Sequence, residues 1–307
     1  MTARVASIAT VCMFCALHAS ADPVRVEIPS SIDGEQQSVD IFPVSDESPR
    51  PLLVMLHNWS VNLDRFDGAE WEAVAKSANW HLVFPDFRGA NNRPEACGSM
   101  IARQDILDAV DYVIQHYSVD KTRIYLAGAS GGGHMALVMA AHAPERWTAV
   151  SAWASISDLA AWHAETKAAD LKYYSDIEAI AGGPPGASQA VDDELRVRSP
   201  VHHLANAKDL PVDIATGIHD GHTGSVPIHH SIDAFNTIAK SRGDDPVDVE
   251  TIARLSVKEY GGAPLFNDLT YGRDIYLRQE AGPSRITIFE GGHEDIPEAA
   301  IAWFGLH

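Results

Sequence analysis

The feature that most constrains this chain is a glycine-rich turn around a serine, Gly128-Ala129-Ser130-Gly131-Gly132. A short apolar run at residues 123–127 leads directly into this turn, and a helix-like run follows at residues 133–143. A strand that turns so sharply into a helix strains the backbone of the serine, and side chains in place of the glycines would collide with neighbouring elements. The helix N-terminus behind the turn favours negative charge beside the hydroxyl. The pattern therefore predicts that Ser130 is a nucleophile.

Short apolar runs alternate with helical patterns along most of the chain. The first two, at residues 24–28 and 38–42, alternate apolar and polar residues as half-buried antiparallel strands do. Further strands are predicted at residues 52–56, 80–84, 123–127, 149–153, 212–216 and 285–289. Apolar residues at helical spacing predict helices between them, for example over residues 106–117 and 228–239. This order predicts an α/β fold with a mostly parallel central sheet and helices on both faces.

Two stretches interrupt the alternation. Residues 159–209 contain helix-like pieces around a Gly-Gly-Pro-Pro-Gly segment, and residues 243–283 are polar and loop-rich. We expect both to be insertions on one edge of a single domain that spans residues 22–307, with a lid-like insertion among them.

A serine hydroxyl is a weak nucleophile until a base takes its proton. The last predicted strand ends in Gly291-Gly292-His293, so we expect His293 above the same edge of the sheet as Ser130. Asp220 follows the strand predicted at residues 212–216 and would orient the imidazole of His293. Asp158, which follows the strand at residues 149–153, is the alternative carboxylate.

Acyl transfer at a serine also needs hydrogen-bond donors for the negatively charged oxygen of the tetrahedral intermediate. The backbone N–H of Gly131, next to the nucleophile, is the first predicted donor. The second is expected from the loop His57-Asn58-Trp59-Ser60, which follows the strand at residues 52–56. We assign it to the backbone of Trp59, whose side chain would either wall an acyl pocket or pack in the core.

The charge balance limits the choice of partners. The chain has 42 acidic and 23 basic residues, a formal net charge of −19. Such a surface repels phosphate backbones and anionic lipids, so neither nucleic acid nor a membrane surface is expected as a partner.

The first 21 residues are predicted to be a signal peptide. Arg4 is their single charge, an apolar run follows it, and Ala19-Ser20-Ala21 forms a small-x-small cleavage pattern. Cleavage after Ala21 would give a secreted or periplasmic protein. It would also remove Cys12 and Cys15, so that Cys97 would have no disulfide partner. We interpret Cys97 as a loop thiol rather than a nucleophile.

Several segments carry a family resemblance. They are Gly128-Ala-Ser-Gly-Gly-Gly-His134, Leu56-His-Asn-Trp-Ser60, Gln104-Asp-Ile-Leu-Asp-Ala-Val-Asp-Tyr112, Arg198-Ser-Pro200 and Gly291-Gly-His293. From about residue 50 to the end, the chain resembles the α/β-hydrolase domain of the prolyl oligopeptidase (S9) family and the related bacterial carbohydrate esterases. The resemblance implies the α/β-hydrolase fold and a triad in the order Ser, Asp, His.

The sequence departs from the family pattern in two ways. The usual acid loop reads Asp-x-x-Val-Pro, whereas Asp220 here precedes Val226-Pro227 by six residues. The resemblance also includes no N-terminal β-propeller, which in the large peptidases selects oligopeptides. A secreted catalytic domain without it resembles the esterases more.

The loop at residues 86–99 follows a central strand and should border the site. Arg88, Asn92 and Arg93 on this loop are predicted to bind sugar hydroxyls or a uronate carboxylate, unless the loop uses them for its own hydrogen bonds. Trp153 is predicted to stack on a sugar ring, with core packing as the alternative. Histidines crowd near Asp220, but no spacing matches a metal motif, so neither a metal nor a cofactor is predicted.

Together these patterns predict a secreted serine hydrolase that cleaves acyl or methyl esters, on a small molecule or a polysaccharide, through an acyl-enzyme. A serine peptidase or aminopeptidase of the same fold is the alternative. A non-catalytic carbohydrate-binding protein with this fold is a further alternative, against which the intact set of Ser130, Asp220 and His293 argues.

Overall fold

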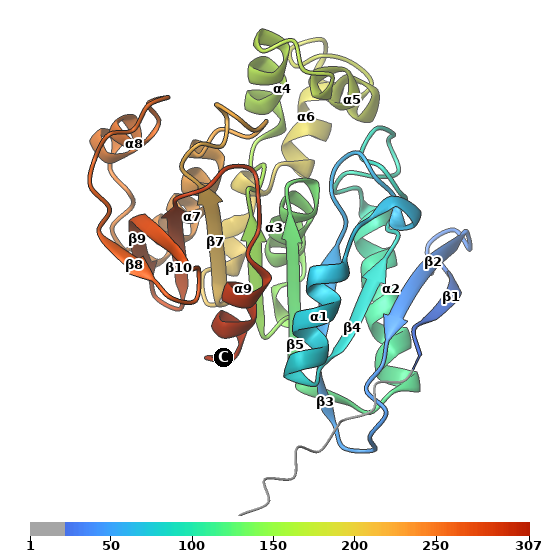
Figure 1. Ribbon diagram of the computed structural model, residues 1–307. Helices are drawn as coiled ribbons and strands as arrows, with labels where there is room; N and C mark the ends of the chain where they lie inside the picture. The colour runs from blue at the N-terminus through green and yellow to red at the C-terminus, as the bar shows by residue number, and fades with distance from the viewer. Residues whose placement is uncertain (1–21) are drawn as a thin grey trace, which may run out of the picture.

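The computed structural model describes residues 22–307, so the predicted signal peptide and its cleavage site after Ala21 lie outside the described residues. The described chain builds one ten-stranded sheet in the order β1-β2-β4-β3-β5-β6-β7-β10-β9-β8 (Figure 1). The strands are β1 (Val24–Pro29), β2 (Gln36–Phe42), β3 (Arg50–Leu56), β4 (His81–Pro85), β5 (Val119–Ala129), β6 (Ala149–Trp153), β7 (Val212–Gly217), β8 (Phe266–Asp268), β9 (Arg273–Ala281) and β10 (Ser284–Phe289).

The centre of the sheet is parallel, as the sequence predicts. Strands β4, β3, β5, β6, β7 and β10 run in the same direction, while β1 and β2 add an antiparallel edge on one side. The solid apolar runs explain this arrangement, because a parallel strand is covered on both faces. In β3, for example, every residue after Arg50 is buried.

Helices cover both faces of the sheet. They are α1 (Ala69–Ala78), α2 (Met100–His116), α3 (Gly131–His142), α4 (Leu159–Ala168), α5 (Tyr173–Ala181), α6 (Gln189–Arg198), α7 (His229–Arg242), α8 (Val249–Leu255) and α9 (Pro297–Phe304). Helices α2, α3 and α7 pack into one apolar core, and α1 and α9 pack into the core on the other face. No helix in residues 22–307 is long and apolar enough to cross a membrane.

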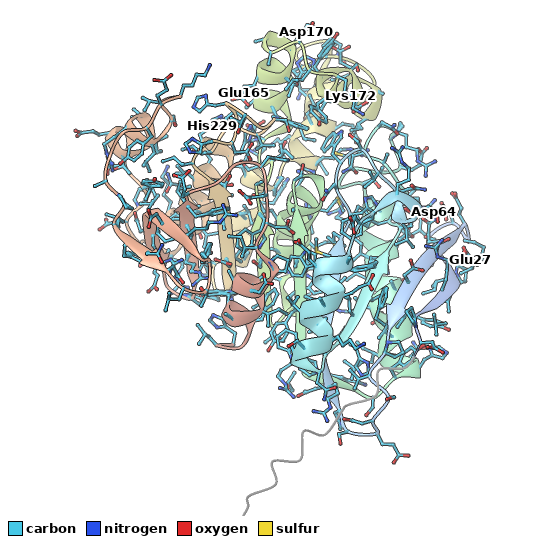
Figure 2. The ribbon with its side chains drawn as sticks, viewed as in Figure 1. Glu27, Asp64, Glu165, Asp170, Lys172 and His229 are labelled. Carbon is cyan, nitrogen blue, oxygen red and sulfur yellow. The ribbon has the colours of Figure 1, made fainter. Side chains whose placement is uncertain are left out.

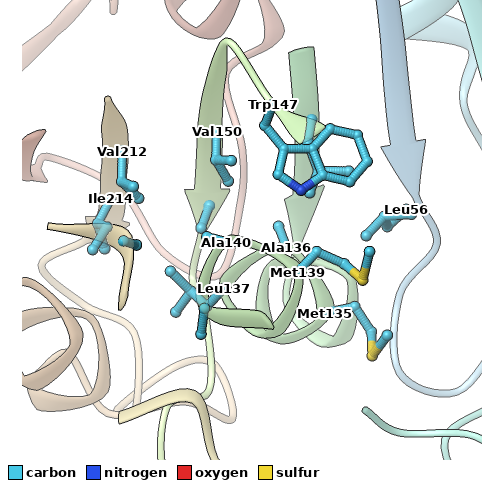
Figure 3. Close-up of a cluster of buried hydrophobic side chains, with 14 of the residues drawn as sticks. Leu56, Met135, Ala136, Leu137, Met139, Ala140, Trp147, Val150, Val212 and Ile214 are labelled. Carbon is cyan, nitrogen blue, oxygen red and sulfur yellow. The ribbon is translucent and has the colours of Figure 1, made fainter. Parts of the chain in front are cut away.

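Helix α3 is buried on all sides, because it has almost no polar face. Its residues from Gly131 to Ala141 are all buried. Figure 3 shows Met135, Leu137 and Met139 of this helix among side chains from strands β3, β6 and β7. Close packing on every side fixes the position of the helix, and therefore of the turn that precedes it.

The stretch at residues 159–209 folds as expected into helical pieces. Helices α4, α5 and α6 stand beyond the carboxyl ends of the central strands, where Figure 1 shows them at the top of the molecule. We call these three helices the lid. They enclose a third apolar cluster that includes Trp162, Ile177 and Leu195 from the lid and Trp59 from the loop after β3.

The stretch at residues 243–283 differs from the expectation of a polar, loop-rich insertion. It contains α8, the short strand β8 and the nine-residue strand β9, which pairs antiparallel with β10 and extends the sheet. In β9 only Ile275 and Ala281 are buried, so the strand is mostly polar and lacks the apolar signature of a central strand. The alternating pair Ile275 and Leu277 was the signal available in the sequence.

Arg88 is a structural residue, and its predicted role in substrate binding is wrong. Its side chain is 1% exposed and forms ion pairs with Asp33, Glu35 and Asp105 at 2.9, 2.6 and 2.5 Å. Asp33 and Glu35 belong to the turn between β1 and β2, whereas Asp105 lies on α2. The guanidinium therefore joins the edge hairpin to a core helix and has no donor left for a substrate.

We expect Arg88→Met to lower the free energy of unfolding by about 3–5 kcal/mol, because it leaves the Asp105 carboxylate buried without a cation. Urea denaturation monitored by circular dichroism measures this change. Arg123→Met is the matched control, since the Arg123 side chain is 46% exposed in its pair with Asp120. Equal and small effects of the two substitutions would contradict the structural role of Arg88.

Candidate active site

Ser130 occupies the strained turn that the sequence predicts. Its backbone angles are φ 56° and ψ −119°, a region that residues other than glycine rarely adopt. The Ser130 N–H donates to the carbonyl of Trp153 at 2.8 Å, and the Ser130 carbonyl accepts from the His134 N–H at 2.8 Å. Strand β6 and helix α3 thus hold the serine on both sides. Among residues 22–307, the Ser130 hydroxyl forms no hydrogen bond and is partly exposed.

The structure joins His293 to Asp220. The Nδ1 atom of His293 lies 2.8 Å from Oδ2 of Asp220, whose side chain is fully buried, while the His293 side chain is 26% exposed. The two residues follow the neighbouring parallel strands β10 and β7. Gly224 permits the contact, because a Cβ there would lie 2.3 Å from Asp220 and 2.5 Å from His293. A buried carboxylate in this position fixes the imidazole tautomer and stabilises its protonated form.

The long acid loop wraps around the Asp220 carboxylate. Oδ1 accepts hydrogen bonds from the backbone N–H of Gly221 at 2.9 Å and of Val226 at 3.2 Å. The hydroxyl of Thr216 on β7 lies 3.5 Å from Oδ2. Six residues separate Asp220 from Val226, which departs from the family pattern. This length lets the loop turn back so that its backbone N–H groups bind the Asp220 carboxylate.

Asp158, the alternative acid, has another function. Its carboxylate caps the N-terminus of lid helix α4 and accepts from the N–H of Ala160 at 2.9 Å and of Ala161 at 3.1 Å. The cap satisfies two donors that would otherwise lack partners at the helix end.

The backbones of Trp59 and Gly131 meet where the predicted oxyanion donors should lie. A Cβ at Gly131 would lie 2.3 Å from the Trp59 nitrogen, so only glycine allows this approach. Neither the Trp59 nor the Gly131 N–H donates a hydrogen bond within the part of the chain that the structure describes. Two free donors beside a nucleophile match the requirements of an oxyanion hole. The Trp59 side chain is 2% exposed and packs against the lid.

A network that sequence reasoning missed links the acid and base loops. Glu290 accepts from the Tyr276 hydroxyl at 2.6 Å and pairs with Nε2 of His219 at 2.8 Å. His219 directly precedes Asp220, and Glu290 stands three residues before His293. The hydrogen bond from Tyr276 lowers the pKa of Glu290, so the carboxylate stays charged and ties β9 to both loops. The short distance in sequence of His219 from Asp220 and of Glu290 from His293 was the signal in the sequence that could have predicted this network.

Trp153 does not offer a stacking surface, so its predicted role in substrate binding is wrong. Its side chain is fully buried, and its indole N–H donates to the Ser151 hydroxyl at 2.8 Å. Core packing fixes Trp153 next to the turn, where its backbone carbonyl accepts the Ser130 N–H. Asn92 and Arg93 are exposed, although the Arg93 guanidinium donates to the carbonyl of Arg88 at 2.6 and 3.0 Å.

Cys97 lies nearer to a histidine than the sequence suggested. Its Sγ is 3.7 Å from Nε2 of His134, and both side chains are buried. Burial raises the pKa of Cys97 to about 12 and lowers the pKa of His134 to about 4. The pair therefore consists of a neutral thiol and a neutral imidazole at physiological pH, which does not generate a nucleophilic thiolate.

Glu165, His229 and His230 form the one candidate metal cluster found in residues 22–307, with ligand atoms within 4.8 Å of one another. Figure 2 shows Glu165 and His229 close together where the lid approaches α7. Nδ1 of His230 accepts a backbone N–H from Ser157 at 3.3 Å, so Nε2 carries the proton and donates to Glu165 at 2.9 Å. A metal on Nε2 would need the proton on Nδ1, where the N–H of Ser157 points.

His229 completes an ion pair rather than a metal site. Its two ring nitrogens lie 2.6 Å from Glu165 and 3.1 Å from Asp233. Burial opposes the charge of His229, but the hydrogen bonds with Asp233 and Glu165 raise its pKa to about 9. The protonated imidazole of His229 thus pairs with both carboxylates, and we interpret the cluster as a charged clamp between α4 and α7.

We expect Asp220→Asn to lower kcat by about 10⁴, because the amide would hold the wrong tautomer of His293. Asp158→Asn should lower kcat less than about threefold, since an asparagine caps a helix as well as an aspartate does. Steady-state kinetics with an ester substrate distinguishes the two. A larger effect at Asp158 would show that the assignment of the acid is wrong.

Comparisons with known proteins agree with this geometry. Residues 71–254, more than half of the chain, match the prolyl oligopeptidase family. Acylamino-acid-releasing enzyme 2 of Oryza sativa is 26% identical over 213 residues, which cover 61% of this chain and 27% of that protein. Poly(3-hydroxyalkanoate) depolymerase C of Paucimonas lemoignei is 26% identical over 122 residues, which cover 36% of this chain and 29% of that protein.

Solved structures share the fold. Acylaminoacyl peptidase of Pyrococcus horikoshii aligns with 94% of this chain at a TM-score of 0.64 and 16% identity. The alignment covers 41% of that peptidase, so this chain spans less than half the length of the proteins it resembles. The family match and the predicted fold are thereby confirmed: the chain belongs to the prolyl oligopeptidase family and has the α/β-hydrolase fold.

Proposed function

We propose that the protein hydrolyses carboxylic esters through an acyl-enzyme at Ser130, and that its substrates are short acyl esters of carbohydrates. The observation that carries the choice of substrate is a polar hollow beside the oxyanion loop. Different groups of residues support the reaction chemistry, the binding of the acyl group and the binding of the carbohydrate.

The chemistry follows from the positions of the triad and the two free N–H groups. His293 takes the proton of Ser130 as the hydroxyl oxygen attacks the ester carbonyl, while Asp220 stabilises the resulting imidazolium. The N–H groups of Gly131 and Trp59 stabilise the negative charge on the carbonyl oxygen. His293 then protonates the leaving alcohol. A water molecule, activated by the same imidazole, releases the acid and restores the Ser130 hydroxyl.

The packing around Trp59 favours a short acyl group in the proposed substrate. Its ring lies edge-on to Trp162 with 4.7 Å between centroids, and Trp162 stacks on Tyr173 at 4.9 Å. Trp59 and Trp162 are almost completely buried, so these rings already fill the space beneath the lid. Closely packed aromatic rings oppose a long acyl chain on this side of the site, which favours a small acyl group such as acetyl.

The carbohydrate is proposed to bind in the polar hollow, a cavity of about 440 Å³ between the loops that follow β3 and β4. Its lining is rich in hydrogen-bonding side chains, among them Ser60, Asn62, Arg65, Asn92 and Arg93. Ser60 follows the oxyanion residue Trp59 directly, so a sugar held here would lie close to the reacting ester. Convergent polar groups of this kind suit the hydroxyls of a sugar.

Acidic groups on the other side of the oxyanion loop favour an uncharged substrate. A second cavity of about 440 Å³ is lined by Asn58, Asp67, Glu70 and Asp295, together with Phe66 and Trp71. Asp295 stands two residues after His293, but burial raises its pKa and so weakens its negative charge relative to an exposed carboxylate. Carboxylates here would repel the unesterified uronates of partly methylated pectin, which supports neutral glycan esters as substrates.

Hydrolysis of acylated peptides is the second candidate function. The relatives named above favour it, because two of them are named for the release of acylamino acids or for acylaminoacyl peptidase activity. The depolymerase of Paucimonas lemoignei, whose name describes a polyester substrate, favours ester hydrolysis. Both reactions would use the same triad and the same oxyanion donors.

We expect Ser130→Ala to remove nearly all activity, because the loss of a triad member leaves only about 10³–10⁴-fold acceleration over water. The assay compares kcat/KM for p-nitrophenyl acetate, acetylated xylan, methylated pectin and an acetyl-aminoacyl anilide. The proposal predicts that the wild-type protein has a higher kcat/KM for acetylated xylan than for pectin or for the anilide. Each value is compared with that of an authentic esterase on the same substrate. Faster turnover of the anilide than of any glycan ester would assign the protein to the second candidate function.

We expect Asn92→Ala to raise KM for acetylated xylan about fivefold, the loss of one hydrogen bond worth about 1 kcal/mol. The rise should exceed the change for p-nitrophenyl acetate, which is too small to fill the hollow. The Asn92 side chain forms no hydrogen bond within residues 22–307, so its removal leaves the loop intact. Arg93→Ala serves as the comparison, since it also breaks the contact with Arg88. If Asn92→Ala changed KM equally for acetylated xylan and for p-nitrophenyl acetate, the hollow would be rejected as the sugar site.

A further inference from the structure

We propose that Asp176, on lid helix α5, is a positioning residue that holds the oxyanion donor Trp59 in place. The inference rests on the proposed acyl-transfer function but not on the choice between esters and amides, because the oxyanion hole serves both. It gives the lid a part in the chemical step in addition to covering the site.

The contact joins the lid to the oxyanion loop through the indole of Trp59. Its Nε1–H donates to Oδ2 of Asp176 at 3.1 Å, across 117 positions of the sequence. The Trp59 carbonyl accepts from the Asn91 N–H at 2.8 Å. The side chain and the carbonyl of Trp59 are therefore both held, whereas its backbone N–H stays free beside Gly131. A residue restrained at these two points can point its N–H in only a narrow range of directions.

The carboxylate of Asp176 is suited to this contact. Its side chain is 16% exposed, and the nearest cation, Nζ of Lys172, lies 3.9 Å away, beyond direct hydrogen bonding. The partly buried oxygen accepts the indole N–H, and a hydrogen bond to a charged acceptor is stronger than one between neutral groups. The Lys172 side chain is 61% exposed, so solvent weakens its attraction for the carboxylate.

The lid also holds the acid loop, so its position affects two sides of the active site. The indole N–H of Trp162 on α4 donates to the carbonyl of Ser225 at 2.8 Å. Ser225 immediately precedes Val226, whose N–H binds the Asp220 carboxylate. The rings of Trp162 and Trp59 are in contact, as described above. The lid thus connects the oxyanion donor with the loop that carries the catalytic acid.

The positioning role predicts a loss of kcat with little change in KM. A misplacement of about 1 Å in a catalytic group can cost on the order of 10²-fold in rate. We therefore expect Asp176→Ala to lower kcat for p-nitrophenyl acetate by about 10- to 100-fold, with KM within about twofold of wild type. Asp176→Asn keeps an acceptor oxygen and should restore most of kcat. Asp193→Ala, which removes an exposed lid carboxylate on α6, should leave kcat unchanged.

A double-substitution cycle tests whether Asp176 acts through Trp59. Trp59→Phe keeps an aromatic ring but removes the indole donor, so adding Asp176→Ala to it should have no further effect on kcat. The second readout is the rate at which a fluorophosphonate labels Ser130, which needs the oxyanion hole but no particular substrate. Circular dichroism and urea denaturation confirm that each variant is folded.

The outcomes separate the inference from the proposed function. Wild-type protein that reacts with the fluorophosphonate but hydrolyses no ester would overturn the proposed function, while the labelling rates would still test Asp176. Asp176→Ala with kcat and labelling rate within twofold of wild type would overturn the positioning role. Additive losses in the double variant, or a loss in Asp176→Asn as large as in Asp176→Ala, would overturn it as well.

Discussion

The strained turn between β5 and α3 is the constraint on which the rest of the structure depends. Ser130 has a φ of 56°, which is costly for a residue with a side chain, and it persists because both flanks of the turn are fixed. Strand β5 lies in the middle of the parallel sheet, and α3 is buried on every side. The long-range packing of the core therefore stabilises a local conformation that places one hydroxyl above the sheet.

The other groups of the site lie at the same edge of the sheet as Ser130 because they follow strands of the same parallel sheet. Trp59 follows β3, Asp220 follows β7 and His293 follows β10, so all three loops leave the same edge. Loops are intrinsically mobile, and each of these is held by contacts from elsewhere. Glu290 joins the acid and base loops, and the lid contacts the oxyanion and acid loops. The two stretches that interrupt the alternating pattern contribute to these supports through the lid and through Tyr276 on β9, whose hydroxyl binds Glu290.

Local patterns in the sequence predicted the elements that depend on local rules, namely the eight main strands, the turn at Ser130 and the loops that carry Asp220 and His293. Long-range pairing explains what they missed. The exposed-looking Arg88 is buried because three carboxylates from two elements surround it, and nothing in the sequence near position 88 shows this. Trp153 is covered by neighbouring strands, and the polar strand β9 forms because β10 offers it an edge. Such partners become visible only in the folded chain.

The central claim is that hydrolysis passes through a covalent acyl-enzyme at Ser130. Rapid mixing with p-nitrophenyl acetate, an acid quench and peptide mass spectrometry test it most directly. We predict an acetyl group on the peptide that contains Ser130, formed within the burst of p-nitrophenol release and absent from Ser130→Ala. An acetyl group on another residue, or full turnover by Ser130→Ala, would contradict the account.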